Sequence, residues 1–223
     1  MNLEQIADPG YSIEPSVLSN SDCDRLIESL CEAKRGRAGV RHLMSNPCVE
    51  ALASDHRLLA IARRTLGQSA IPFRATLFEK SGQANWLIAW HQDTALPLAS
   101  FFDAPGGPWS RKAGVLCAHA PTWALSRILA LRVHLDASTS QNGPLRVIPG
   151  SHAGGVLTDD DVLNYAKARD GIECLIPRGG VLTMRPLLIH ASSKARVEDP
   201  RRVLHIEYSD AVELAPGIRL AVA

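Results

Sequence analysis

Three residues of this chain have the side chains and the spacing of an open metal site. His91 and Asp93 are two residues apart, so on an extended strand an imidazole and a carboxylate point to the same face. A third ligand must come from elsewhere in the chain, and His190 is the best candidate. Two histidines and one carboxylate that leave neighbouring coordination positions free form the facial triad of non-haem Fe(II) oxygenases. The residue types therefore predict an iron site.

An arginine stands at a suitable place to serve the same site. Arg201 follows His190 by eleven residues and begins an apolar segment that continues to residue 208. A guanidinium forms two parallel hydrogen bonds with a carboxylate. Arg201 is therefore a candidate for holding the carboxylate of a co-substrate.

The chain has eight histidines, and the other six fit roles other than metal binding. A histidine among apolar neighbours is more often a satisfied, partly buried residue than a ligand. We expect His42 and His56 at surface positions in the N-terminal helices, and His134 and His205 at cavity-facing positions without an acid at ligand spacing. We expect His119 in a solvated loop and His152 in a hydrogen-bonded turn.

Length and composition exclude several classes of protein. The 223 residues are 46% hydrophobic and 21% charged, which is typical of one globular domain spanning residues 1–223. The net charge of +1, without a long Lys/Arg cluster, argues against nucleic acid, and no apolar stretch is long enough for a membrane span. The N-terminus has no apolar signal region, so a cytoplasmic location is the default. Five scattered cysteines without a Cys-x-x-Cys pair argue against a disulfide framework or a thiolate metal site.

The order of elements indicates helices first and strands afterwards. Ser21 resembles an N-cap for a helix over 22–33, and Asn46-Pro47 opens a second helical region that Gly67 closes. Helical support is therefore expected over about 20–67. From Ile71 onward, short apolar segments separated by turn residues predict a β sandwich or barrel over about 70–209.

Two segments of this β region face the expected site. Residues 128–136 alternate apolar and ionisable side chains, which puts Arg132 on a face that must meet water or a polar cavity. Residues 95–122 form an irregular, Pro/Gly-rich segment directly after Asp93, and we interpret it as a lid over the substrate. A surface loop without a role is the alternative. Aromatic residues in the lid and the pair Arg111 and Lys112 would suit an amphipathic acid; the aromatic residues are Phe101, Phe102 and Trp109.

Four segments taken together resemble one enzyme family in content and order. They are 91–93, 142–152, 190–192 and 201–203, and they resemble the phytanoyl-CoA dioxygenase (PhyH) family of Fe(II)/2-oxoglutarate-dependent oxygenases. The resemblance implies a mainly β fold with flanking helices, a double-stranded β-helix of the jelly-roll or cupin-like kind. It implies hydroxylation of a small molecule with O2 and 2-oxoglutarate as co-substrates and release of succinate and CO2.

The resemblance also assigns individual residues. His91, Asp93 and His190 match the iron ligands, and Arg201 matches the arginine that pairs with the distal carboxylate of 2-oxoglutarate. Ser192 matches a hydroxyl that helps to hold this carboxylate. Asp93 favours hydroxylation, because halogenating relatives have a small residue there. The resemblance does not extend to acyl-CoA specificity, because the chain is short and has no recognisable CoA-binding segment.

Some alternatives stay open at this point. Arg132 stands where relatives often carry an aromatic or uncharged residue, so it faces either 2-oxoglutarate, an acidic substrate or a salt-bridge partner in the barrel wall. The fold would also suit a cupin-like metal enzyme that does not use 2-oxoglutarate, or a non-catalytic small-molecule binding protein.

Overall fold

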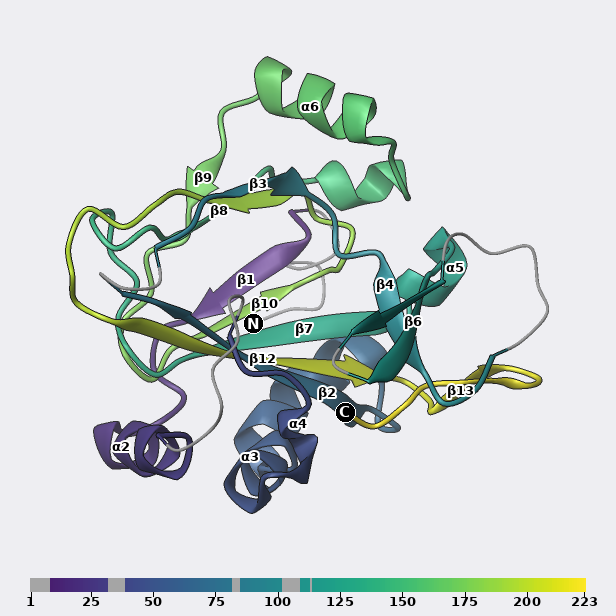
Figure 1. Ribbon diagram of the computed structural model, residues 1–223, viewed down its shortest axis with the longest axis horizontal. Coiled ribbons are helices and arrows are strands. Elements are labelled where there is room, and N and C mark those ends of the chain that lie inside the picture. Colours follow the sequence, from purple (N-terminus) through teal and green to yellow (C-terminus); the bar gives the residue numbers. More distant parts are fainter. Residues whose placement is uncertain (1–8, 32–38, 82–84, 102–108, 113) are drawn as a thin grey trace.

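Two antiparallel sheets face each other and form the body of the molecule (Figure 1). The computed structural model describes residues 9–31, 39–81, 85–101, 109–112 and 114–223. The major sheet has the strand order β1 (Tyr11–Glu14), β10 (Val181–Met184), β7 (Ile128–His134), β12 (Arg201–Ser209), β2 (Ile71–Lys80). The minor sheet has the order β3 (Ile88–His91), β11 (His190–Ser192), β8 (Leu145–Val147), β9 (Ile172–Glu173). This arrangement confirms the predicted double-stranded β-helix.

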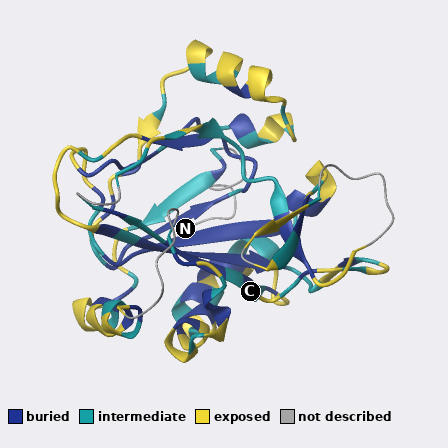
Figure 2. Ribbon diagram, viewed as in Figure 1, coloured by how far each residue is buried: buried dark blue, intermediate teal, exposed yellow. Residues whose placement is uncertain are grey.

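Three helices cover the outer face of the major sheet (Figure 1). They are α2 (Asn20–Ser29), α3 (Pro47–Ala53) and α4 (His56–Leu66), with the 3₁₀ turn η1 (Leu43–Ser45) between the first two. Their apolar sides are buried against the sheet and their polar sides face outward (Figure 2). Leu26 and Leu58 of the helices share one core with Leu131 and Val133 of β7. This packing fixes one face of β7 and leaves the other face toward the barrel interior.

The helix boundaries differ in detail from the prediction. Ser19, not Ser21, caps α2, because Ser19 and Asp22 form a reciprocal capping box that places Ser21 inside the helix. The predicted end of this helix at residue 33 lies outside the described residues. The second helical region begins at Asn46-Pro47 as predicted and ends before Gly67, but it is two helices. Asp55 interrupts it, since its side chain accepts a hydrogen bond from the backbone N–H of Arg57 and starts α4.

The segment 95–122 contains strands and is not the irregular segment that we expected. A small antiparallel sheet has the order β4 (Ala95–Leu98), β6 (Val115–His119), β5 (Trp109–Lys112). Leu96 and Leu98 are buried in a core with Phe73 and Leu125, which stabilises the sheet against the barrel. Pro97 within β4 and the Pro/Gly cluster at 105–108 concealed the strands in the sequence. Phe102 and residues 103–108 lie outside the described part of the chain.

The remaining described elements are α6 and four short segments. α6 (Asp159–Ala168) lies over the minor sheet, as Figure 1 shows, and buries Val162 against Ile148 and Ile189. The other elements are short: α5 (Thr122–Leu125), η2 (Ser151–Gly154), β13 (Glu213–Ala215) and β14 (Ile218–Arg219).

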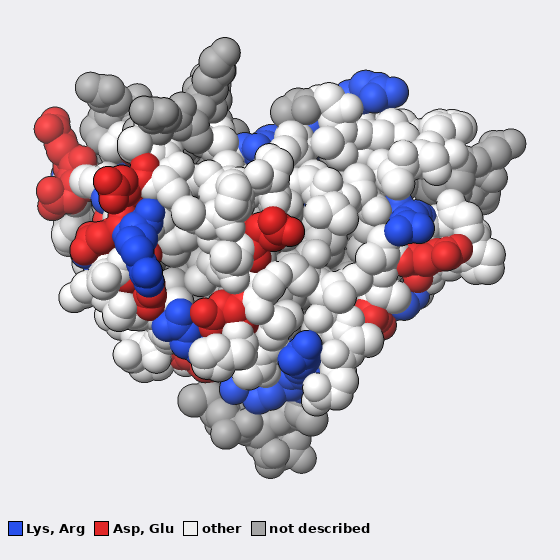
Figure 3. Space-filling model, turned by 90° about the horizontal axis from the view of Figure 1, so that it is seen from below, with Lys and Arg blue, Asp and Glu red and all other residues white. Residues whose placement is uncertain are grey.

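On the face seen from below in Figure 3, Lys and Arg alternate with Asp and Glu, and neither sign forms a continuous field.

Candidate active site

The minor sheet brings the three predicted metal ligands together. His91 is the last residue of β3, His190 is the first residue of β11, and the two are direct cross-strand partners. Asp93 follows two residues after His91, and its backbone N–H donates to the carbonyl of Pro186, 2.9 Å away. Strand pairing therefore fixes the two histidines, and a backbone hydrogen bond fixes the turn that carries the carboxylate.

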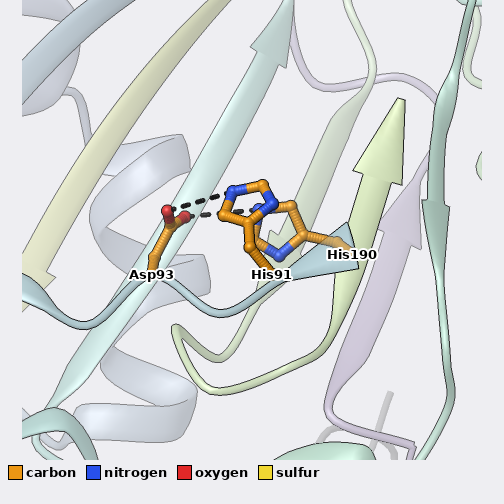
Figure 4. Close-up of side chains that lie close together, drawn as sticks. All are labelled: His91, Asp93 and His190. Atoms are coloured by element: carbon orange, nitrogen blue, oxygen red, sulfur yellow. Dashed lines mark ion pairs between the residues drawn. The ribbon is translucent and has the colours of Figure 1, made fainter. Parts of the chain in front are cut away.

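The three side chains converge on one point (Figure 4). The Nε2 atoms of His91 and His190 lie 3.7 Å and 3.5 Å from the two carboxylate oxygens of Asp93. One ligand atom from each residue lies within 4.8 Å of the others, and the two imidazole centroids are 4.2 Å apart. Two nitrogens and one oxygen at this spacing fit a divalent metal ion and leave the remaining positions open to other ligands.

Hydrogen bonds to the backbone orient both imidazole rings. The Nδ1 atom of His91 lies 2.8 Å from the carbonyl of Ala89, and Nδ1 of His190 lies 2.8 Å from the carbonyl of Leu188. A carbonyl only accepts, so each Nδ1 carries the hydrogen and each Nε2 keeps its lone pair for a metal. The same i to i−2 contact in both strands sets the tautomer that metal binding requires.

The ionisation states of the ligands also suit a metal. Burial opposes ionisation of Asp93, but His190 and His91 beside it hold the pKa of this carboxyl well below its usual value. Burial lowers the pKa of His190 to about 4, with the neighbouring His91 acting in the same direction. Asp93 is therefore anionic and His190 neutral at neutral pH, as metal ligands must be.

Gln92, between two of the ligands, points away from them. Its side-chain amide donates to the carbonyls of Gly155 and Leu187 at 2.9 Å and 2.7 Å, and its oxygen accepts from the N–H of Leu157 at 2.9 Å. These three bonds tie the ligand-bearing strand to two other segments of the barrel. Gln92 therefore stabilises the position of the metal ligands.

A cavity of about 330 Å³ adjoins the ligands and ends in buried cations. Lys80 and Arg201, directly opposite each other on β2 and β12, are 2% and 4% exposed. The Lys80 ammonium donates to the hydroxyl of Ser192 at 2.7 Å and to the carbonyl of Ser193, and Arg201 donates to the carbonyl of Asn142 at 3.1 Å. The guanidinium of Arg201 also lies 3.5 Å from the Ser192 hydroxyl. This end of the cavity fits a carboxylate.

Arg132 lies in the same cavity and has no salt bridge to a carboxylate within the described ranges. Its guanidinium donates to Nδ1 of His205 at 3.2 Å and lies over the ring of Phe78, with 5.4 Å from Cζ to the ring centroid. Its Nε is buried without a partner in the described structure. These contacts favour the ligand-facing interpretation of Arg132 over the salt-bridge one.

The structure also shows where most of the other histidines lie. His205 faces the cavity, as strand alternation suggested, and His134 is buried without lining it. His56 and His119 are exposed. His42 is half-buried instead of a surface residue, because its Nε2 donates to the carbonyl of Lys112 at 2.9 Å. Lys80 was missed, although its signal was present: it continues the alternation of Arg74, Thr76 and Phe78 along one face of β2.

A comparison with protein-family models supports this geometry over most of the chain. The model of the family described as Phytanoyl-CoA dioxygenase (PhyH) matches residues 10–203. The chain belongs to the PhyH family. It is therefore an Fe(II)- and 2-oxoglutarate-dependent dioxygenase, which confirms the enzyme class and co-substrates that the motifs predicted.

Two curated relatives, a hydroxylase and a dioxygenase, are similar to this chain in sequence. The chain is 24% identical to an L-proline trans-4-hydroxylase from Streptomyces griseoviridis, over 90% of this chain and 82% of that protein. It is 30% identical to an ectoine dioxygenase from Sphingopyxis alaskensis over 130 residues, which are 56% of this chain and 36% of that protein.

Solved structures share the fold at low sequence identity. EctD from S. alaskensis with 2-oxoglutarate and 5-hydroxyectoine has a TM-score of 0.71 and 21% identity, with 94% of this chain and 75% of that chain covered. AviO1 from Streptomyces viridochromogenes has a TM-score of 0.68 and 19% identity, with 98% and 96% covered. These likenesses establish the double-stranded β-helix for this PhyH-family chain.

Proposed function

We propose that His91, Asp93 and His190 hold Fe(II) and that the cavity behind them holds 2-oxoglutarate during hydroxylation of a small molecule. The observation that carries the proposal is a set of one carboxylate and two imidazoles, converging beside a cavity whose far end is cationic. With iron and 2-oxoglutarate bound, the site supplies O2 activation coupled to decarboxylation of the co-substrate to succinate and CO2.

The far end of the cavity binds the distal carboxylate of 2-oxoglutarate in this proposal. Arg201 and Lys80 supply the charge, and the Ser192 hydroxyl, which contacts both side chains, supplies a hydrogen bond. Two buried cations face each other there, and no described acid pairs with either, an arrangement that is costly unless an anion binds. A cupin-like enzyme without 2-oxoglutarate, or a binding protein for uncharged molecules, would have no use for these cations.

The protein has three tasks in the reaction. The backbone bonds of the two imidazole rings and the three bonds of Gln92 hold the metal ligands in place. Arg201, Lys80 and Ser192 orient the co-substrate. The small sheet of β4, β6 and β5 borders the cavity through Ala95, Lys112 and His119, and we assign it the role of cover over the substrate.

The relatives support a small-molecule substrate. The cytoplasmic location stays a prediction. In the described ranges, no helix is long and apolar enough to cross a membrane.

The test is O2-dependent conversion of 2-oxoglutarate to succinate by the Fe(II)-loaded protein, with L-proline and ectoine among the trial substrates. We expect turnover in the wild type and none in Asp93→Gly, because a facial triad without its carboxylate loses one of three ligands. Asp160→Asn, at an exposed acid of α6, is the matched control and should keep full turnover. Full turnover by Asp93→Gly would show that Asp93 is not a ligand.

A further inference from the structure

We infer that the substrate of this enzyme carries an anionic group, a carboxylate or a phosphate, which Arg41 and Lys112 bind at the mouth of the cavity. The inference rests on the proposed function, because it takes 2-oxoglutarate to occupy the far end at Lys80 and Arg201. It adds a charge and a place for the substrate that neither the family nor the relatives define.

The charge balance of the cavity is the first observation. Among its described lining residues there are two acids, Asp93 and Glu207, against six cations, an excess of four positive charges. The two charges of Fe(II) and the two of 2-oxoglutarate cancel, so the loaded cavity keeps this excess. The cations are Arg41, Arg74, Lys80, Lys112, Arg132 and Arg201.

Both acids are already engaged. Asp93 faces the metal site, and both carboxylate oxygens of Glu207 bind the guanidinium of Arg74, one of them at 2.6 Å. The Arg74 guanidinium also donates to the carbonyl of Ala95 at 3.1 Å. No carboxylate of the described lining is therefore left for an ammonium group of a substrate, whereas cations remain for an anion.

The order of groups along the cavity separates the two ligands. On β2, Arg74 and Lys80 are six residues apart, about 20 Å along the strand. The Arg74 guanidinium donates to the carbonyl of Ala95, two residues after Asp93, and the Lys80 ammonium donates to the hydroxyl of Ser192, two residues after His190, so the metal ligands lie between these two ends. The co-substrate fills the space from Lys80 toward the metal, so the substrate must approach from the Arg74 end.

Arg41 and Lys112 border this open end. Both side chains are exposed and line the cavity. His42, the one non-glycine residue with positive φ in the described part of the chain, takes φ = 61° and hydrogen-bonds the Lys112 carbonyl. The hydrogen bond holds the segment of Arg41 against β5 and so brings the two cations to one mouth.

The strand β5 provides a matched control. Arg111 and Lys112 are neighbours on β5, so their side chains point to opposite faces. Lys112 lines the cavity, whereas Arg111 is exposed, does not line it, and donates to the carbonyl of Gly114 at 3.3 Å. Loss of the Arg111 charge changes the net charge of the protein by the same amount as loss of the Lys112 charge.

The experiment measures anion binding directly near the metal. The protein is loaded with Mn(II) in place of Fe(II) and with saturating 2-oxoglutarate, without O2, and acetate and inorganic phosphate are the probes. Paramagnetic Mn(II) shortens the relaxation times of the acetate protons and the phosphate ³¹P nucleus when either anion binds nearby. We expect a saturable effect for at least one probe, and none with diamagnetic Zn(II). The probe with the larger effect identifies the anionic group.

The variants then locate the bound anion. The double variant Arg41→Gln/Lys112→Gln should weaken probe binding about tenfold or more, since charged hydrogen bonds are lost, whereas Arg111→Gln should bind as the wild type does. If the double variant unfolds, Lys112→Gln alone replaces it. Absence of any probe effect in the wild type, or an equal effect in the variant, would overturn the inference.

The failure of the proposed function gives a different result. It would show as absence of the visible charge-transfer band when the Fe(II) protein receives 2-oxoglutarate. A normal band without anion binding would overturn only the inference about the substrate.

Discussion

Strands β2 and β12 carry a charged cross-strand pair at each end of the cavity. One pair has opposite charges, and the other has two positive charges. At one end Arg74 lies opposite Glu207, and at the other end Lys80 lies opposite Arg201. Opposite charges in direct cross-strand positions stabilise a sheet, and like charges destabilise it. Three of the four side chains are almost fully buried, and Arg74 is 15% exposed. The first pair therefore stabilises the fold, whereas the second pair is expected to be stabilised by a bound anion.

This difference explains how one barrel wall supports both stability and binding. The Arg74–Glu207 pair neutralises itself and also binds the strand β4 that follows the metal ligands. Among the residues that the structure describes, the Lys80–Arg201 pair donates only to backbone carbonyls and one hydroxyl. Functional sites commonly hold groups that destabilise the protein without ligand. The two ends should therefore respond in opposite ways to mutation.

The largest effect is expected from breaking the complementary pair. Glu207→Ala leaves the Arg74 guanidinium buried without its partner, and we expect the free energy of unfolding to fall by about 3–5 kcal/mol. Lys80→Met, at the other end of the same strand, should change it by less than about 1 kcal/mol, because relief of repulsion offsets lost hydrogen bonds. Urea unfolding of both variants measures the two values. Equal losses would show that the ends do not differ in role.

Removing the arginine of the like-charged pair should affect binding and not stability. Arg201→Ala should weaken the apparent affinity for 2-oxoglutarate by about 10- to 100-fold, the value of one or two charged hydrogen bonds. Fe(II) binding should stay unchanged, because Arg201 does not contact the metal ligands. Titration with 2-oxoglutarate at saturating Fe(II) measures the effect, and an unchanged affinity would refute the assigned role.

Lys80 should give 2-oxoglutarate binding a pH dependence. Burial, together with Arg201 and Arg132, lowers the pKa of Lys80 from 10.5 to about 8. A bound carboxylate favours the protonated amine, so binding takes up a proton above pH 8 and affinity falls as pH rises. The loss should approach tenfold for each pH unit above about 8, as the charged fraction falls. In Lys80→Arg the fall should vanish; a fall that persists would assign the titration to another group.

The smallest effect is expected at the neutral partner of the pair. Ser192→Ala removes one hydroxyl from the cationic end, and the affinity for 2-oxoglutarate should fall by about two- to tenfold. Ser126→Ala, at an exposed turn after α5, is a serine control outside the cavity. Isothermal titration of both variants compares them, and identical affinities would remove Ser192 from the co-substrate site.

Local signals in the sequence predicted much of the fold, and non-local pairing accounts for what they missed. The Asn46-Pro47 helix start, the strand at 128–134 and the His-x-Asp segment depend on neighbours in the chain, and each was predictable. The strands at 95–98, 109–112 and 115–119 are stabilised by Phe73 and Leu214, which are distant in sequence. The Pro/Gly residues around them indicated a loop, and this local signal was misleading.

The site shows the same division. The pair His91 and Asp93 was predictable because residue type and spacing define it, whereas His190 was chosen among the remaining histidines and by the family resemblance. Strand alternation could have put Lys80 on the face of Arg74, Thr76 and Phe78, but only the strand register places it opposite Arg201. The sequence also could not predict that no described carboxylate pairs with Arg132, since this depends on which acids lie near it in three dimensions.

The central claim is that the three ligands hold iron in front of a 2-oxoglutarate site, and one titration tests it most directly. Purified protein is titrated without O2, first with Fe(II) and then with 2-oxoglutarate, while the visible metal-to-ligand charge-transfer band of the chelated complex is recorded. We expect the band in the wild type and in His56→Ala, whose side chain is 90% exposed, and its loss in His190→Ala. Iron binding without the band would contradict the account and favour a cupin-like enzyme that does not use 2-oxoglutarate.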